Sequence, residues 1–218
     1  MNKIGNAENQ NDSDVVHQKR RGRPKCFDEA KALETAMLLF WEFGYEATSI
    51  SDLTKALNIT APSLYGTFGD KAALFEKCVA FYLQHEACPA GVLLQSGKTA
   101  KISIELFLYD NIKRLVQEHK PKGCMMVIAT MNCSQENSAL QLQLKERRQY
   151  TRDKVYKRIL EGQKAGEIGT NVDLNHLTDF YCTILQGMTI QARDGAELED
   201  LELIAQYAIK AWDALIKD

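Results

Sequence analysis

"TSISDLTKALNITAPSLYGTFGDKAALF", residues 48–75, contains three helix starts in quick succession. Ser49 and Asp52 have the S-x-x-D spacing of a capping box, in which two residues satisfy free backbone N–H groups at a helix start. Thr60 and Asp70 are further residues of the kinds that cap helix N-termini. The stretch therefore predicts two short helices followed by a longer one.

The turn between the two short helices is tight. Asn58 tolerates the positive φ that such a turn requires, and Pro62 lies in the first turn of the next helix, where its missing N–H does no harm. That helix is expected from Ala61 to about Phe68, with Gly69 ending it. Two short helices around a tight turn form a helix-turn-helix unit.

The rest of the chain is also predicted to be helical. Before the unit, Asp28 can cap a helix whose apolar residues recur at intervals of three and four from Leu33 to Phe43, and Gly44 supplies its left-handed end. Beyond Pro89 no sustained period-two alternation occurs, and residues Pro89 to Gly97 read as a break. Further helices are expected near residues 98–118, 123–133, 136–165, 173–193 and 197–216. The predicted fold class is all-α.

Composition describes an ordinary globular protein. The 218 residues are 45% apolar and 26% charged, with a formal net charge of -2. No apolar run has the length of a signal peptide or a membrane span, so we expect a cytosolic protein without a membrane partner. The 6 cysteines and 4 histidines are dispersed, with no CxxC motif. We therefore expect no metal site and no cofactor.

A family resemblance covers the region from about Arg21 to Tyr82. The residues that carry it are "ALETAMLLFWEFGYEATSISDLTKALNITAPSLYGTFGDKAALF". This string resembles the DNA-binding domain of the tetracycline-repressor (TetR) family of bacterial transcription regulators. The resemblance implies a three-helix DNA-binding head, a fourth connecting helix, and a larger helical ligand-binding domain that dimerises through its last two helices. Many members place Gly in the turn where this chain has Asn58, which also visits the left-handed region.

This resemblance suggests three segments. We expect a disordered basic arm over residues 1–26, a helix-turn-helix DNA-binding domain over residues 27–72, and a helical regulatory and dimerisation domain over residues 73–218.

The second helix of such a unit lies in the major groove of DNA. Ser63 and Thr67 can hydrogen-bond bases or phosphates, and Ala61 and Pro62 can contact a thymine methyl group. Tyr65 and Lys71 match family positions that bind the DNA backbone, whereas Leu64 and Phe68 are assigned to the core. The predicted contact residues of the head are Thr48, Ser49, Thr60, Ala61, Pro62, Ser63, Tyr65, Thr67 and Lys71. This helix has no Arg or Asn for a bidentate base contact, so we expect specificity from many weak contacts and from DNA shape.

A basic cluster, "KRRGRPK", precedes the head at residues 19–25. Its RGRP core resembles an AT-hook, in which glycine and proline let flanking arginines enter the minor groove of A·T-rich DNA. The predicted contacts of this arm are Arg20, Arg21, Arg23 and Lys25. The alternative is a solvated basic tail that improves solubility.

The later helices supply candidates for a dimer interface and an effector pocket. Many of these apolar residues can equally belong to the core of one chain. The candidate interface residues are Phe180, Ile184, Gly187, Ile190, Ile204, Tyr207, Ala208 and Trp212. The candidate pocket residues are Phe107, Met125, Met126, Cys133, Tyr150, Cys182 and Met188.

These observations favour a ligand-responsive DNA-binding regulator that acts as a dimer on a palindromic operator. We expect the protein in the bacterial cytoplasm, associated with the nucleoid when it is bound to DNA. Repression is the usual mode of the family. Two alternatives remain: an architectural protein of A·T-rich DNA without a defined operator, and a thiol-based redox sensor version of the regulator, for which Cys26 beside Lys25 is a candidate. An enzyme is not expected, because the sequence contains no nucleophile-base set and no phosphate-binding glycine loop.

Overall fold

The computed structural model describes residues 28–217, and within them every regular element is a helix. The predicted all-α fold class is confirmed. The helices are α1 (Glu29–Ala47), α2 (Ile50–Leu57), α3 (Ala61–Phe68), α4 (Lys71–His85), α5 (Ala90–Ser96), α6 (Ala100–Leu115), α7 (Met125–Ile128), η1 (Gln135–Asn137), α8 (Ser138–Lys164), α9 (Leu174–Arg193) and α10 (Leu198–Leu215).

The helix starts near the N-terminus follow the predicted caps. The Asp28 carboxylate accepts hydrogen bonds from the backbone N–H groups of Ala30 and Lys31 at the start of α1. Both halves of the capping box between Ser49 and Asp52 are formed at the start of α2. These short-range hydrogen bonds fix where each helix begins.

The tight turn of the helix-turn-helix unit is also formed as predicted. Asn58 has φ 52° and ψ 44°, which is the left-handed conformation, and its backbone N–H donates to the Lys55 and Thr54 carbonyls. The Thr60 hydroxyl then caps α3, with Pro62 in the first turn. After α3, Gly69 has φ 85° and leads directly into α4.

Helices α1 to α4, which we call the head, share one apolar core. The Phe40 ring packs edge-on against Phe75 at 5.1 Å, and Trp41 packs edge-on against Tyr82 at 4.9 Å. The predicted core residues of α3 are buried here, Leu64 at 0% and Phe68 at 2% exposure.

The core of the head continues beyond the predicted domain boundary after residue 72. That boundary lies inside α4, and buried residues from α4 onward join the core of the head. Those residues are Leu74, Phe75, Cys78, Val79, Tyr82, Met125, Met126, Ala129, Leu140 and Leu144. The division into domains stays a prediction, and any such boundary has to allow for this continuous core.

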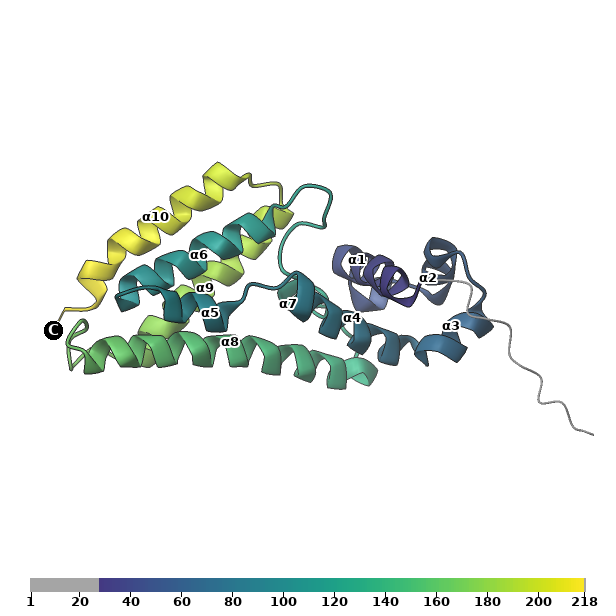
Figure 1. Ribbon diagram of the computed structural model, residues 1–218, viewed down its shortest axis with the longest axis horizontal. Coiled ribbons are helices and arrows are strands. Elements are labelled where there is room, and N and C mark those ends of the chain that lie inside the picture. The colour runs from purple at the N-terminus through teal and green to yellow at the C-terminus, as the bar shows by residue number, and fades with distance from the viewer. Residues whose placement is uncertain (1–27, 218) are drawn as a thin grey trace, which may run out of the picture.

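Helices α5, α6, α8, α9 and α10, which we call the body, form a second apolar core. In Figure 1, α8 runs along the body from the head end to the opposite end, and the last turns of α10 lie far from α2 and α3. The Tyr181 ring on α9 lies 5.5 Å from the Trp212 ring on α10, and its hydroxyl donates to the Ala208 carbonyl at 3.0 Å. This contact ties α10 to α9.

Two parts of the predicted helix pattern were wrong. The expected break from Pro89 to Gly97 contains α5, a seven-residue helix whose Leu94 is buried against the body core. It is too short to show a clear periodic pattern. The helix expected over residues 123–133 is only the single turn α7, because the backbone leaves it at Ala129 to accept a hydrogen bond from Tyr45 N–H at 2.8 Å.

The left-handed turn gives a test of stability. Asn58→Ala is expected to lower the free energy of unfolding by about 1 kcal/mol, since Ala pays a steric cost in the left-handed region. Asn58→Gly avoids that cost and is the matched control. Urea denaturation followed by circular dichroism measures both. Equal losses for the two variants would show that backbone conformation does not determine the choice of residue here.

Candidate nucleic-acid interface and ligand pocket

Helix α3 presents one side to solvent. Leu64 and Phe68, four residues apart, anchor its inner side, whereas Pro62, Ser63 and Tyr65 are exposed. Ala61 and Thr67 are half-buried at the edges of the exposed side. The predicted contact residues of α3 therefore lie on or beside one continuous exposed side.

The polar groups at the start of α3 are arranged locally. The Thr60 and Ser63 hydroxyl groups are 3.0 Å apart and hydrogen-bonded to each other. The side chain of Tyr65 is 49% exposed, and its hydroxyl has no hydrogen-bond partner within residues 28–217. These hydroxyl groups can donate to phosphate oxygens or base edges, which is the chemistry expected of such a helix.

The structure corrects the prediction for Thr48. Its side chain is 1% exposed, and its hydroxyl donates to the Gly44 carbonyl at 2.7 Å, so the side chain does not reach the surface. Ser49 is exposed, but its hydroxyl donates to the Asp52 carboxylate at 2.6 Å. Hydrogen bonds from Ser49 lower the pKa of Asp52, so a negative charge occupies the α2 N-terminus. A phosphate there would have to compete with this carboxylate.

Two lysines lie close to α3. The Lys71 ammonium lies 3.4 Å from the Glu46 carbonyl and 4.4 Å from the Tyr45 ring centre, and its burial lowers its pKa. The Lys77 ammonium lies 3.5 Å from the Thr67 carbonyl at the end of α3. Sequence reasoning missed Lys77, and no motif marks it.

The predicted arm contacts Arg20, Arg21, Arg23 and Lys25 lie outside the described residues.

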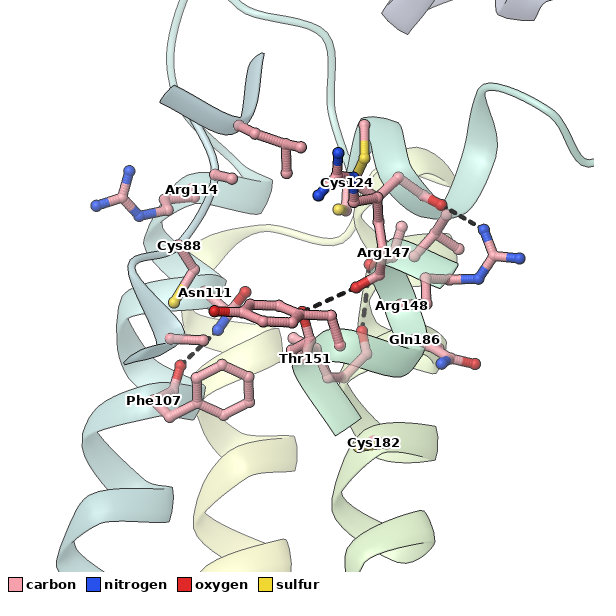
Figure 2. A pocket seen from close by; sticks show the side chains of 18 of the residues that line it. Cys88, Phe107, Asn111, Arg114, Cys124, Arg147, Arg148, Thr151, Cys182 and Gln186 are labelled. Atoms are coloured by element: carbon pink, nitrogen blue, oxygen red, sulfur yellow. Dashed lines mark hydrogen bonds between the residues drawn. The ribbon is translucent and has the colours of Figure 1, made fainter. Parts of the chain in front are cut away.

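A cavity of about 410 Å³ lies where the head meets the body (Figure 2). Its walls come from the end of α4, the α4–α5 connection, the start of α5, α6, the loop before α7, α7 itself, α8 and α9. In Figure 2, Cys88, Asn111 and Arg114 lie on one side of the cavity, and Arg147 and Arg148 lie on the other. The volume is in the range of pockets that hold small organic molecules.

The predicted pocket residues separate into two groups. Phe107, Met126, Tyr150 and Cys182 line the cavity. Three others do not line it, and for the two methionines the reason is that neighbouring residues on a helix point in different directions. Met125 is buried in the head core, Met188 in the body core, and Cys133 is half-buried beyond α7.

Sequence reasoning missed the polar lining of the cavity. The "RRQYTR" stretch, residues 147–152, places three arginines on one segment of α8, and all three line the cavity with Arg114 of α6. This charge run was the available signal. Arg114 Nε lies 2.6 Å from the Asp110 carboxylate, and Arg152 Nε lies 2.6 Å from the Asp179 carboxylate.

The cysteines among the described residues ionise to thiolates less readily than exposed cysteines do. Burial raises the pKa of the Cys78, Cys88, Cys124 and Cys133 thiols, and it raises the pKa of Cys182 to about 11. Because the thiolate is the reactive form, each of these thiols is less reactive than an exposed one. Cys26 lies outside the described residues.

The structure also sorts the candidate interface residues. Ala208 and Trp212 are buried in the body core at 4% and 2% exposure, so these two predictions were wrong. Phe180, Ile184, Ile190 and Ile204 are half-buried, Gly187 is exposed, and Tyr207 is 69% exposed. Leu203, which was missed, is 52% exposed one helical turn before Tyr207.

Comparison with known proteins identifies the family. Residues 32–78 match the sequence profile of the bacterial regulatory proteins of the tetR family. The HTH-type transcriptional repressor ComR of Escherichia coli (strain K12) is 35% identical over 211 residues, which cover 94% of this chain and 99% of ComR. The chain belongs to the TetR family.

Other members are similar over most of their length. The HTH-type transcriptional repressor BdcR of Escherichia coli (strain K12) is 27% identical over 199 residues, covering 90% of this chain and 95% of BdcR. A solved structure of the TetR family regulator CifR, a cysteine mutant complexed with 26-bp operator DNA, has a TM-score of 0.82 and 32% identity, covering 87% of this chain and 100% of that one. As a TetR family member, this protein is a DNA-binding transcriptional regulator.

Within residues 28–217, none of the helices has both the length and the apolar character needed to cross a membrane.

The pKa of Cys182 predicts its reactivity. With a pKa of about 11, only about a thousandth of the thiol is ionised at pH 8, so alkylation by iodoacetamide should accelerate about tenfold per pH unit up to pH 10. Mass spectrometry of the peptide that contains Cys182 measures the rate. A rate that levels off below pH 9 would contradict the raised pKa and would revive a redox role for this pocket residue.

Proposed function

We propose that the protein is a repressor that binds a palindromic operator as a homodimer and releases it when an effector occupies the cavity between the head and the body. The observation that carries this proposal is the position of the cavity. Part of its wall, the linking segment (residues 123–129), is hydrogen-bonded directly to α1 of the head. Residues 27–72 as the DNA-binding unit and residues 73–218 as the regulatory unit, with α4 joining them, are part of the proposal.

The linking segment has two hydrogen bonds to α1. The buried Trp41 Nε1–H donates to the Gly123 carbonyl at 3.1 Å, and Tyr45 N–H donates to the Ala129 carbonyl at 2.8 Å. Gly123, Cys124, Met126 and Val127 of the same segment line the cavity. A ligand that displaces this segment must therefore strain or move α1, which carries the core of the head.

The opposite side of the linking segment is packed tightly against α9. A Cβ atom added to Gly123 would lie 3.0 Å from the Thr189 carbonyl oxygen, and Gly123 has φ 83°. At the end of α9, Arg193 donates a hydrogen bond to the Glu42 carbonyl of α1. The head is thus held by both the linking segment and α9, and this contact surface can favour one orientation of the head over another.

The effect of an effector on DNA affinity follows from linkage. An effector that binds more tightly to a head orientation that does not fit the operator lowers operator affinity, and DNA lowers effector affinity by the same factor. In a two-fold dimer, two copies of α3 would enter successive major grooves about 34 Å apart, which requires a palindromic operator.

The dimer interface is proposed on the outward faces of α9 and α10. Leu203 and Tyr207 are exposed apolar residues one turn apart on α10, and Phe180, Ile184 and Gly187 form the neighbouring surface of α9. Large exposed side chains on α10 beside half-buried apolar residues on the adjacent α9 suit a four-helix interface between identical chains. Within the protomer, Ala208 and Trp212 support this face from behind.

We further propose regulation rather than catalysis, and action in the bacterial cytoplasm, where the operator is. The raised pKa values of the described cysteines count against the thiol-based version of the regulator. The architectural alternative depends on the arm, residues 19–25, which lies outside the described residues.

Selection of bound genomic fragments by the purified protein at about 150 mM salt tests the DNA-binding role, because this condition screens exposed charges. We expect one or a few palindromic sites. Broad recovery of A·T-rich fragments without a shared palindrome would contradict operator-specific repression and favour the architectural alternative.

The dimer interface has its own test. The double variant Leu203→Glu with Tyr207→Glu is expected to be a monomer at micromolar concentration, since it buries charge in the proposed interface. It should also bind an operator at least about tenfold more weakly, because one half-site contact is lost. Sedimentation measures the oligomeric state.

Val92→Glu is the matched control, because Val92 is a 66% exposed apolar residue on α5, away from this face. A double variant that remains dimeric would place the interface elsewhere.

A further inference from the structure

The cavity has an unusual balance of charge. Four arginines line it, Arg114, Arg147, Arg148 and Arg152, and no aspartate or glutamate is among its described lining residues. We propose that the effector is an organic anion with an apolar body, whose carboxylate or similar group binds Arg148 and Arg147. This inference rests on the proposed function, because it assigns a ligand class to the same cavity.

Two of the four arginines already have anionic partners. Arg114 is paired with Asp110, and Arg152 is paired with Asp179. The side-chain hydrogen bonds in these pairs raise the pKa of each guanidinium. Because a carboxylate neutralises each of these two guanidinium groups, neither attracts an anionic ligand strongly.

Arg147 and Arg148 differ from them. Arg148 is half-buried, and its one described hydrogen bond goes from Nη1 to the Met126 carbonyl at 2.6 Å, so no carboxylate neutralises it. The Arg147 guanidinium is exposed and has no hydrogen-bond or ion-pair partner within residues 28–217. A partly desolvated guanidinium without a counter-ion is costly, and an anionic ligand would remove that cost. Burial also lowers the pKa of Arg148, as expected for a cation without a counter-ion.

The rest of the lining suits an apolar body. Leu83, Phe107, Met126, Val127 and Leu185 line the cavity beside the arginines. Arginine binds carboxylates and sulfonates through two parallel N–H donors, which fixes the orientation of the ligand as well as its charge. The combination favours a fatty or aromatic acid over a neutral molecule of the same shape, and over a cation.

Arg148 also connects this ligand class to the response. Its hydrogen bond holds the Met126 carbonyl, which belongs to the linking segment that is bonded to α1. An anion that binds the Arg148 guanidinium would weaken the hydrogen bond from Arg148 to the Met126 carbonyl. The linking segment would then be less firmly fixed. The same residue would then recognise the charge of the ligand and transmit its presence.

A matched pair of fluorescent probes tests the ligand class on the full-length protein without DNA. Anilinonaphthalene sulfonate is anionic, and phenylnaphthylamine has the same ring system without the sulfonate. The wild-type protein should bind the sulfonate more tightly. Arg148→Gln should weaken sulfonate binding by about tenfold to a hundredfold, as loss of a charge-assisted hydrogen bond does, and leave the neutral probe within about twofold.

Two further variants keep the test decisive. Lys157→Gln, which removes an exposed charge on α8 away from the cavity, is the control and should bind both probes like the wild type. Should Arg148→Gln fail to fold by circular dichroism, Arg147→Gln carries the same expectation, because that guanidinium has no hydrogen bond or ion pair to lose among the described residues. Equal weakening of both probes, or no preference for the sulfonate in the wild type, would overturn the proposed ligand class.

DNA binding then separates this inference from the proposed function. Saturating sulfonate probe should lower affinity for a selected operator in the wild type and less so in Arg148→Gln. Binding of the sulfonate through Arg148 without any change in DNA affinity would uphold the ligand class and contradict the cavity as the effector site. Release of DNA by the neutral probe alone would contradict the ligand class and uphold the cavity as the effector site.

Discussion

The hydrogen bond from the Trp41 indole to the Gly123 carbonyl is the interaction on which the arrangement of this molecule depends. It is buried, and it joins residues 82 positions apart in the chain, so it fixes the linking segment to α1 where the two apolar cores meet. The aromatic contact between Trp41 and Tyr82 then carries this attachment into α4. Through these contacts, the head, the wall of the cavity and the start of the body form one connected unit.

The head could be predicted from the sequence because its structure is set by local chemistry. The caps at Asp28, Ser49 and Thr60 satisfy N–H groups within three residues of themselves, and Asn58 forms its turn through its own backbone angles. Such signals are readable without knowing what lies nearby in space. The family resemblance covers the same region and adds the expectation of DNA contact, but it could not indicate that the Thr48 side chain turns inward to Gly44.

The cavity and the interface face could be predicted only in part, because they depend on which side of each helix meets another helix. Adjacent methionines, Met125 and Met126, have the same chemistry, yet only the second lines the cavity. Trp212 looks like an interface residue by size and type, but its partner is Tyr181 in the same chain. Long-range packing decides these cases, and one sequence alone does not contain that information in readable form.

Helix α9 lines the cavity with one side and belongs to the proposed dimer interface with the other. Cys182, Leu185, Gln186 and Thr189 follow one another at helical spacing along the cavity, while Gly187 lies on the outward side of the same turns. A packed helix moves as a rigid rod, so a displacement made on its cavity side appears at once on its outer side. In a dimer built on that outer side, the two cavities would be coupled. Occupancy would then depend on effector concentration with a Hill coefficient different from one.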